Sequence, residues 1–318
     1  ALDHITQAVP GMARRVAGQQ GALAALLAAV CAGGAAAVPS LQNAAQHSMI
    51  VLARVTSSGP EHAWLLAKEP RALPTLVAAL SAGGPAAVDS WQGMAANSAI
   101  VLGQLAAASP HVALCISEEP DTLPALVAAV AAGGPVAATN LQKVAANSAL
   151  ALAAIASASP DLAQRVAEAP GALLVLVSAV AAGGVAAASM SQVIAKNSAL
   201  VLASIASANP GLARRVAEAP EVLPVLVAAV AAGGDTAVRA RRAVDAIRSW
   251  AQGQAAAAGA ACGHCGHSAD GTAGVRLRMC TGCNTAQFRS KECRRYGWGS
   301  HKAACRALAA TSGCNMGA

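Results

Sequence analysis

Apolar and polar positions along the chain follow a pattern that repeats every 50 residues without drift. Two sets of prolines keep this register, as do Gly-Gly pairs and single glutamine and serine residues. The prolines are Pro10, Pro60, Pro110, Pro160, Pro210, Pro70, Pro120, Pro170 and Pro220; the glycine pairs are at 33-34, 83-84, 133-134, 183-184 and 233-234; the polar residues are Gln42, Gln92, Gln142, Gln192, Ser48, Ser98, Ser148 and Ser198. A fixed period of this length is typical of stacked structural repeats.

Each unit predicts three helices, as the segment from Pro160 to Pro210 illustrates. A short helix begins at Pro160, because proline suits the first helical turn. A second helix follows Pro170 and ends at Gly183-Gly184, and a long third helix runs from about Val185 to Ala208. No stretch alternates with period two, so strands are not expected. Since no helix buries its apolar face alone, we expect an all-α, right-handed solenoid over residues 1–250.

Alanine dominates the apolar fraction of the chain. Apolar residues make up 55% of the sequence and aromatic residues 2%, which favours thin, closely packed helices. The uncharged stretch from Gly171 to Ala188 has about the length of a short membrane span, but its glycine pair breaks it. We therefore expect no membrane-spanning helix, and no secretory signal is visible.

The repeat resembles the armadillo repeat, with HEAT repeats as the alternative, since 50 residues is long for either. The matching segments are Thr122-Leu123-Pro124-Ala125-Leu126-Val127 and the run from Ala149 to Ala156. The resemblance implies that the third helices line a groove. In nuclear-import adaptors that groove holds a ladder of tryptophans and a ladder of asparagines. The positions equivalent to the tryptophans are here Ile50, Ile100, Leu150 and Leu200. Those equivalent to the asparagines are Arg54, Gln104, Ala154 and Ser204. An import-adaptor role is therefore not expected.

A different polar ladder recurs on the third helices, at His47, Asn97, Asn147 and Asn197. Its side chains either bind the backbone of an extended peptide or form hydrogen bonds within the solenoid. We favour bonds within the solenoid, because buried polar groups usually find internal partners.

Cysteine is concentrated at the C-terminal end of the chain. Cys31 and Cys115 lie alone in apolar segments and are expected to be buried, whereas the other seven follow a flexible linker at 251–261. The motif, over residues 262–305, is Cys262-x2-Cys265, Cys280-x2-Cys283, Cys293 and His301-x3-Cys305. Paired thiols and an imidazole at this spacing indicate zinc rather than disulfides, and hence a reducing intracellular compartment, cytoplasm or nucleus.

This motif resembles the MYND zinc finger, including an aromatic residue at Phe288 and a tryptophan at Trp298. The resemblance implies two interleaved zinc sites. Cys280, Cys283, His301 and Cys305 would form one firm site. Cys262, Cys265 and Cys293 would form a weaker one, because Arg289 occupies the position of its fourth cysteine and a guanidinium cannot bind zinc. His264 or His267 is the favoured substitute for the missing fourth ligand. A water or Cys314 is a less favoured substitute.

The same resemblance implies a peptide-binding role. MYND fingers generally bind short proline-containing peptides, and Trp298 would be the apolar platform unless it serves only as core. The family often has glutamine where this chain has Arg294, which affects peptide preference. A RING-type ubiquitin ligase is the structural alternative, but its last ligand pair is usually CxxC, whereas this pair is HxxxC.

Charge separates the two regions. Residues 1–254 carry 14 basic and 13 acidic side chains, and the remaining 64 residues carry 8 and 2. The finger's basic residues are therefore candidate phosphate contacts, which keeps a nucleic-acid-associated regulator as the alternative function, although aromatic residues for base stacking are few. No paired acids or nucleophile motif accompany the solenoid histidines. We therefore expect a protein-interaction adaptor rather than an enzyme, with protein or peptide partners and no membrane.

The two ends of the sequence give two further expectations. Ala1, Leu2, Ile5, Ala8 and Pro10 match residues 151–160 in register, so we expect the sequence to begin midway along a third helix of a longer solenoid. Residues 306–318 are expected to form a tail after the finger.

Overall fold

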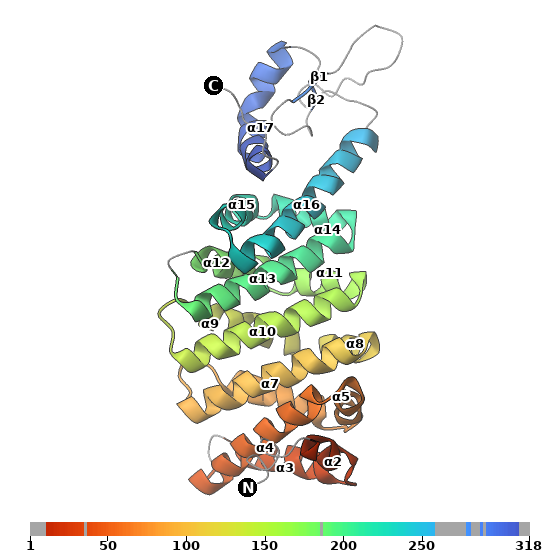
Figure 1. The fold of residues 1–318 in the computed structure, drawn as a ribbon, viewed down its shortest axis with the longest axis vertical. Helices are drawn as coiled ribbons and strands as arrows, with labels where there is room; N and C mark the ends of the chain where they lie inside the picture. The colour runs from red at the N-terminus through yellow and green to blue at the C-terminus, as the bar shows by residue number, and fades with distance from the viewer. Residues whose placement is uncertain are drawn as a thin grey trace.

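The computed structural model describes residues 11–34, 37–184, 187–257, 278–280, 287–288 and 291–311. Within these ranges the chain is helical apart from two short strands and the connecting turns. The helices stack into an elongated solenoid of three-helix units, and a final helix lies at its C-terminal end (Figure 1). The expected all-α solenoid is confirmed.

Each unit contributes two shorter helices and one longer helix. The first helices are α2 (Met12–Gly18), α5 (Pro60–Ala67), α8 (Pro110–Glu118), α11 (Pro160–Glu168) and α14 (Pro210–Glu218). The second are α3 (Ala22–Ala32), α6 (Ala72–Ala82), α9 (Thr122–Ala132), α12 (Ala172–Ala182) and α15 (Val222–Ala232). The third are α4 (Pro39–Ser57), α7 (Asp89–Ala108), α10 (Thr139–Ala158), α13 (Ser189–Ala208) and α16 (Gly234–Ala257). The third helices lie side by side as one layer (Figure 1).

The recurring prolines and caps explain where the first helices begin. In the later units a polar residue directly before the proline caps the helix: Ser159 Oγ accepts from Leu162 N at 3.2 Å, and Asn209 Oδ1 accepts from Leu212 N at 2.8 Å. Proline at the first helical position loses no intrahelical hydrogen bond there. Each unit therefore starts at a position that the sequence specifies locally.

The first glycine of each of the first four pairs allows the second and third helices of a unit to approach closely. A Cβ atom at Gly83, Gly133 or Gly183 would lie 2.1–2.2 Å from the Cβ atom of Ala95, Ala145 or Ala195, respectively. Normal carbon–carbon contacts are about 3.5–4.0 Å. The second glycine of these three pairs has no heavy atom within 4 Å of its position for a Cβ. Only the first glycine is therefore required sterically.

The repeated polar residues hold the units together internally. Gln92 Nε2 donates to Ala87 O at 2.9 Å, and Gln192 Nε2 donates to Ala187 O at 3.1 Å, so the glutamines fix the loop before each third helix. Ser98 Oγ donates to Leu76 O at 2.5 Å, which joins the third helix to the second. These contacts satisfy the named donors, whereas the equivalent hydroxyls of Ser148 and Ser198 are buried without a hydrogen-bond partner among the described residues.

The asparagine ladder links neighbouring units. Asn147 Nδ2 donates to Ala96 O at 3.1 Å, and Asn197 Nδ2 donates to Ala146 O at 2.9 Å, each reaching the third helix of the preceding unit. At the first position of the ladder, His47 Nδ1 lies 2.7 Å from Asn43 O within its own helix. The interpretation that this ladder bonds within the solenoid is confirmed at these positions.

Several expected boundaries differ in the structure. The third helix of the illustrated unit begins at Ser189 rather than near Val185, because Gln192 binds the preceding loop. Residues 251–257 of the expected flexible linker belong to α16, since alanine and glutamine also favour helix. Cys31 is exposed, with its Sγ 3.1 Å from Thr75 Oγ1, and Cys115 is half-buried, so neither is the buried residue that we expected. Residues 1–10 lie outside the described ranges, and the expected start within a longer solenoid stays a prediction.

By length and composition alone, α10 is apolar enough to cross a membrane, as are the bent pairs α2–α3 and α11–α12 if each is taken as one span. In the fold, 67% of the apolar window of α10 is buried, and the helix packs between α7 and α13. The uncharged stretch noted in the sequence yields only the 11-residue helix α12. The apolar character of these helices is thus used in packing one unit against the next.

The last elements cover the end of the stack. Strands β1 (Arg278–Met279) and β2 (Gln287–Phe288) pair antiparallel, and α17 (Lys291–Thr311) follows. Helix α17 contacts α15 and α16, much as α15 contacts α12 (Figure 1). It continues to Thr311, past the expected end of the finger at 305, so the expected tail begins inside a helix.

Candidate metal centre

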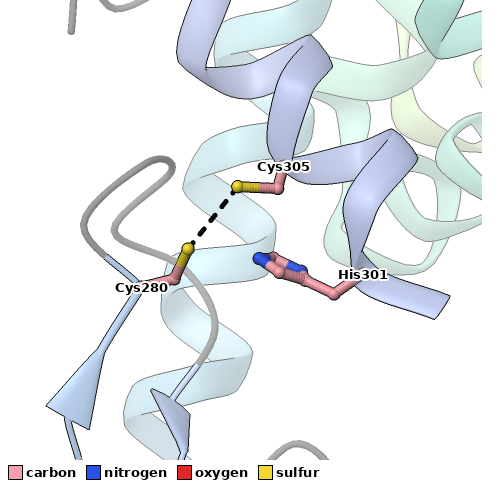
Figure 2. Close-up of side chains that lie close together, drawn as sticks. All are labelled: Cys280, His301 and Cys305. Carbon is pink, nitrogen blue, oxygen red and sulfur yellow. Dashed lines mark hydrogen bonds between the residues drawn. The ribbon is translucent and has the colours of Figure 1, made fainter. Parts of the chain in front are cut away.

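Three side chains from the C-terminal elements converge on one point. Cys280 follows β1, whereas His301 and Cys305 lie on α17, and all three side chains point toward one another (Figure 2). Their ligand atoms lie within 4.8 Å of one another, and the two sulfur atoms are 3.5 Å apart. This sulfur separation is far too long for a disulfide, in which the bond length is about 2.0 Å.

The local sequence explains the convergence. His301 and Cys305 are four residues apart on α17, which places them on one helix face. The hairpin brings Cys280 to that face, and Phe288 of β2 packs edge-on against the His301 ring with centroids 5.7 Å apart. Phe288 is buried, so the aromatic residue of the motif positions a candidate ligand.

The donor set fits zinc. Two thiolates at tetrahedral angles and about 2.3 Å from one ion are about 3.8 Å apart, which is close to the observed sulfur separation. Burial lowers the pKa of His301 below its ordinary value, which favours the neutral imidazole that a metal needs. Cys280 and Cys305 are buried, and a cation between them would compensate the charge of two thiolates. The cluster can therefore hold a metal ion.

The remaining predicted ligands have different outcomes. Cys293 is half-buried on α17 and does not belong to the group of three. Cys262, Cys265 and Cys283 lie outside the described residues, as do the candidate substitutes His264 and His267 and the position of Arg289. The fourth ligand of the firm site and the whole of the weaker site therefore stay predictions.

Trp298 lies between the metal cluster and a surface hollow. Its ring packs edge-on against His301, with centroids 5.8 Å apart, and the residue is half-buried. It also borders a hollow of about 410 Å³, whose other described lining residues are Lys291, Arg294 and Arg295. The contact with His301 agrees with the interpretation of Trp298 as core, and its role as a peptide platform stays a prediction.

Sequence reasoning did not single out Lys291 and Arg295. They belong to the general basic charge of the module, and in the structure they border the same hollow as Trp298 and Arg294. The signal was present in the sequence, because residues 291, 294, 295 and 298 have the spacing of one helix face.

The layer of third helices offers a second surface. At the position of the absent tryptophan ladder, Leu150 is 48% exposed, and Ile50, Ile100 and Leu200 are half-buried. At the position of the absent asparagine ladder, Gln104 bonds to Thr56 and Ser57, and Ser204 Oγ lies 2.9 Å from Ser157 Oγ. This surface is an aliphatic stripe beside polar groups that already have internal partners.

Comparison with known proteins supports the fold but not the finger family. No protein-family model and no curated protein matches the chain. A designed armadillo repeat protein, YIII(Dq.V1)4CPAF, in complex with the peptide (KR)4, is similar over 77% of this chain and 90% of its own, at 22% identity and a TM-score of 0.60. The solenoid has an armadillo-like fold.

Two further solved structures agree with this assignment. The designed armadillo repeat protein YIII(Dq)4CqI matches 78% of this chain and 100% of its own, at 20% identity and a TM-score of 0.56. The structure titled Uso1-2 matches 78% of this chain and 35% of its own, at 11% identity and a TM-score of 0.58. At these identities the similarity shows the armadillo-like fold alone, and the MYND resemblance stays a hypothesis.

Proposed function

We propose that the protein is a zinc-dependent, non-enzymatic interaction adaptor. The armadillo-like solenoid presents the third-helix layer to one protein partner, and the C-terminal MYND-like module captures short proline-containing peptides. The observation that supports this most directly is the position of Trp298, which contacts the candidate zinc ligand His301 and also borders a surface hollow. Metal binding would fix the ring at the hollow through that contact.

The solenoid part of the proposal is supported by the fold and by an exposed surface. One similar designed armadillo repeat protein is complexed with the basic peptide (KR)4. In this chain α4, α7, α10 and α13 carry three cations, Arg54, Lys143 and Lys196, and one acid, Asp89, and their exposed stripe is aliphatic around Leu150. We therefore expect its partner to be less basic than that peptide. We propose that the adaptor acts in a reducing compartment, cytoplasm or nucleus, because clustered thiols without disulfides are typical of such compartments.

The peptide-binding role is tested with Trp298→Ala in the full chain loaded with zinc. Removing an aromatic anchor should weaken capture of proline-containing peptides by more than about tenfold, as is usual for a dominant interface residue. The control is Trp64→Ala, because Trp64 is an exposed tryptophan in the solenoid and, like Trp298, lies near a cation, with Lys68 Nζ 3.2 Å from its ring centroid.

Zinc content must be measured in parallel, because Trp298 contacts a candidate ligand. We expect zinc to stay bound in Trp298→Ala, and Trp298→Phe provides a variant that keeps a ring against His301. Equal peptide binding by the wild type and by zinc-loaded Trp298→Ala in a peptide array would remove Trp298 from the site.

A further inference from the structure

Three cationic side chains and one indole ring occupy the same face of α17. Lys291, Arg294, Arg295 and Trp298 are spaced i, i+3, i+4 and i+7, and they line one hollow of about 410 Å³. The three cations are exposed, and Trp298 is half-buried. The hollow therefore combines a cationic rim with an aromatic wall.

The rim cations differ from the arginines of the solenoid. On α11 and α14 the arginines form ion pairs with neighbouring glutamates: Arg165 with Glu118, Arg215 with Glu168, and Arg214 with Glu218. Among the described residues, Lys291, Arg294 and Arg295 form no such pair, and the acidic neighbour Glu292 does not line the hollow. Cations one turn apart on a helix repel one another, so an anionic ligand between them would lower that repulsion.

The size of the face fits a short segment. From Lys291 to Trp298 the helix rises about 10 Å, which an extended peptide spans with about three residues. Three cations can neutralise only about three phosphates, so the electrostatic attraction of this face for nucleic acid would be small. The geometry and the charge therefore favour a peptide that has carboxylates close to an apolar residue.

We propose that the hollow on α17 selects acidic peptides, with an apolar residue against Trp298 and flanking aspartate or glutamate side chains on Lys291, Arg294 and Arg295. This inference assumes the proposed function, that Trp298 binds peptides, and adds the charge class of the ligand. Arginine suits the role because its planar guanidinium binds a carboxylate through two hydrogen bonds.

The test measures fluorescence anisotropy of three labelled peptides with the zinc-loaded full chain. All three have a Pro-Ala-Pro centre, flanked on each side by two glutamates, two serines or two lysines. At low salt the glutamate peptide should bind on the order of tenfold tighter than the serine peptide, as expected for several exposed ion pairs. The lysine peptide should bind most weakly. The preference should shrink as salt is raised, because exposed charges are screened.

A variant without the three cations separates their contribution to peptide binding from that of the Trp298 ring. Replacing the cations together, by Lys291→Gln, Arg294→Gln and Arg295→Gln, should remove the preference for the glutamate peptide over the serine peptide. The control is Arg14→Gln with Arg15→Gln, which removes exposed cations on α2 at the opposite end of the solenoid (Figure 1). This control should leave the preference unchanged.

The possible results are distinct. Equal binding of the serine and glutamate peptides would overturn the inference and leave the proposed peptide-binding function standing. Binding of none of the three would overturn both. A single-stranded oligonucleotide that binds tighter than the glutamate peptide, and loses affinity in the rim variant, would make the hollow a nucleic-acid site and overturn the inference. A glutamate preference that persists in the rim variant would also overturn it.

Discussion

The close approach of the second and third helices at the first glycine of each of the first four pairs gives a sharp stability prediction. In Gly183→Ala the new methyl group would lie 2.1 Å from Ala195 Cβ and 3.1 Å from Ser191 O, so α12 and α13 must separate by more than an ångström. Overpacking of this kind typically costs about 1–3 kcal/mol. Alanine in place of glycine returns about 0.4–1 kcal/mol through the unfolded chain, so the net loss relative to the wild type is about 0–2.6 kcal/mol.

Gly184→Ala is the matched control, because no heavy atom lies within 4 Å of its added Cβ. It should be neutral or slightly stabilising. In thermal unfolding followed by far-ultraviolet circular dichroism, Gly183→Ala should lower Tm by about 2–12 °C relative to the control, because the unfolded-chain gain is common to both variants and only the overpacking cost separates them. Adding Ala195→Gly should recover part of that loss, although glycine inside a helix costs about 1 kcal/mol. A Gly183→Ala protein as stable as Gly184→Ala would refute the steric explanation of the repeat.

Three further predictions concern the metal and the ladder. Mild chelation should leave about one equivalent of zinc bound. Complete removal of zinc should unfold α17 while the solenoid keeps its helices, since structural zinc supplies about 10 kcal/mol or more to such modules. Loss of most of the helical circular-dichroism signal would contradict this prediction. Arg289→Cys should tighten the weaker site, measured by competition with a zinc indicator, and unchanged affinity would argue against the assigned position. Asn197→Ala should destabilise the solenoid by about 1–2 kcal/mol, because it removes the hydrogen bond to Ala146 O. Asn43→Ala, at an exposed site, should have little effect on the free energy of unfolding. Chemical denaturation of the two variants tests the difference.

Much of the solenoid was predictable because its repeats are specified by local rules. Proline at the start of the first helices and a glycine pair after the second are signals that act within a few residues. The steric reason for the first glycine was not predictable in the same way. It depends on Ala95, Ala145 and Ala195, which lie 12 residues further along and meet the glycine only after the third helix has folded back.

The candidate site was predictable in its ligand types but not in its surroundings. The spacing of His301 and Cys305 already placed them on one helix face, and Cys280 joined them as the motif indicated. The contact between Trp298 and His301 and the hollow beside it depend on how α17 packs, which spacing does not encode. The expectation of a flexible linker is wrong for residues 251–257, because an alanine-rich composition is compatible with both a flexible segment and a continuation of α16.

The placement of α17 against α15 has a consequence for ligands that engage both surfaces. Because that contact fixes the hollow relative to the third-helix layer, a partner chain with two binding segments must join them by a linker of matching span. Below that span simultaneous binding is excluded, and well above it the effective concentration of the second segment falls. The distance between motifs in a partner would then decide avidity, even where each motif alone binds weakly.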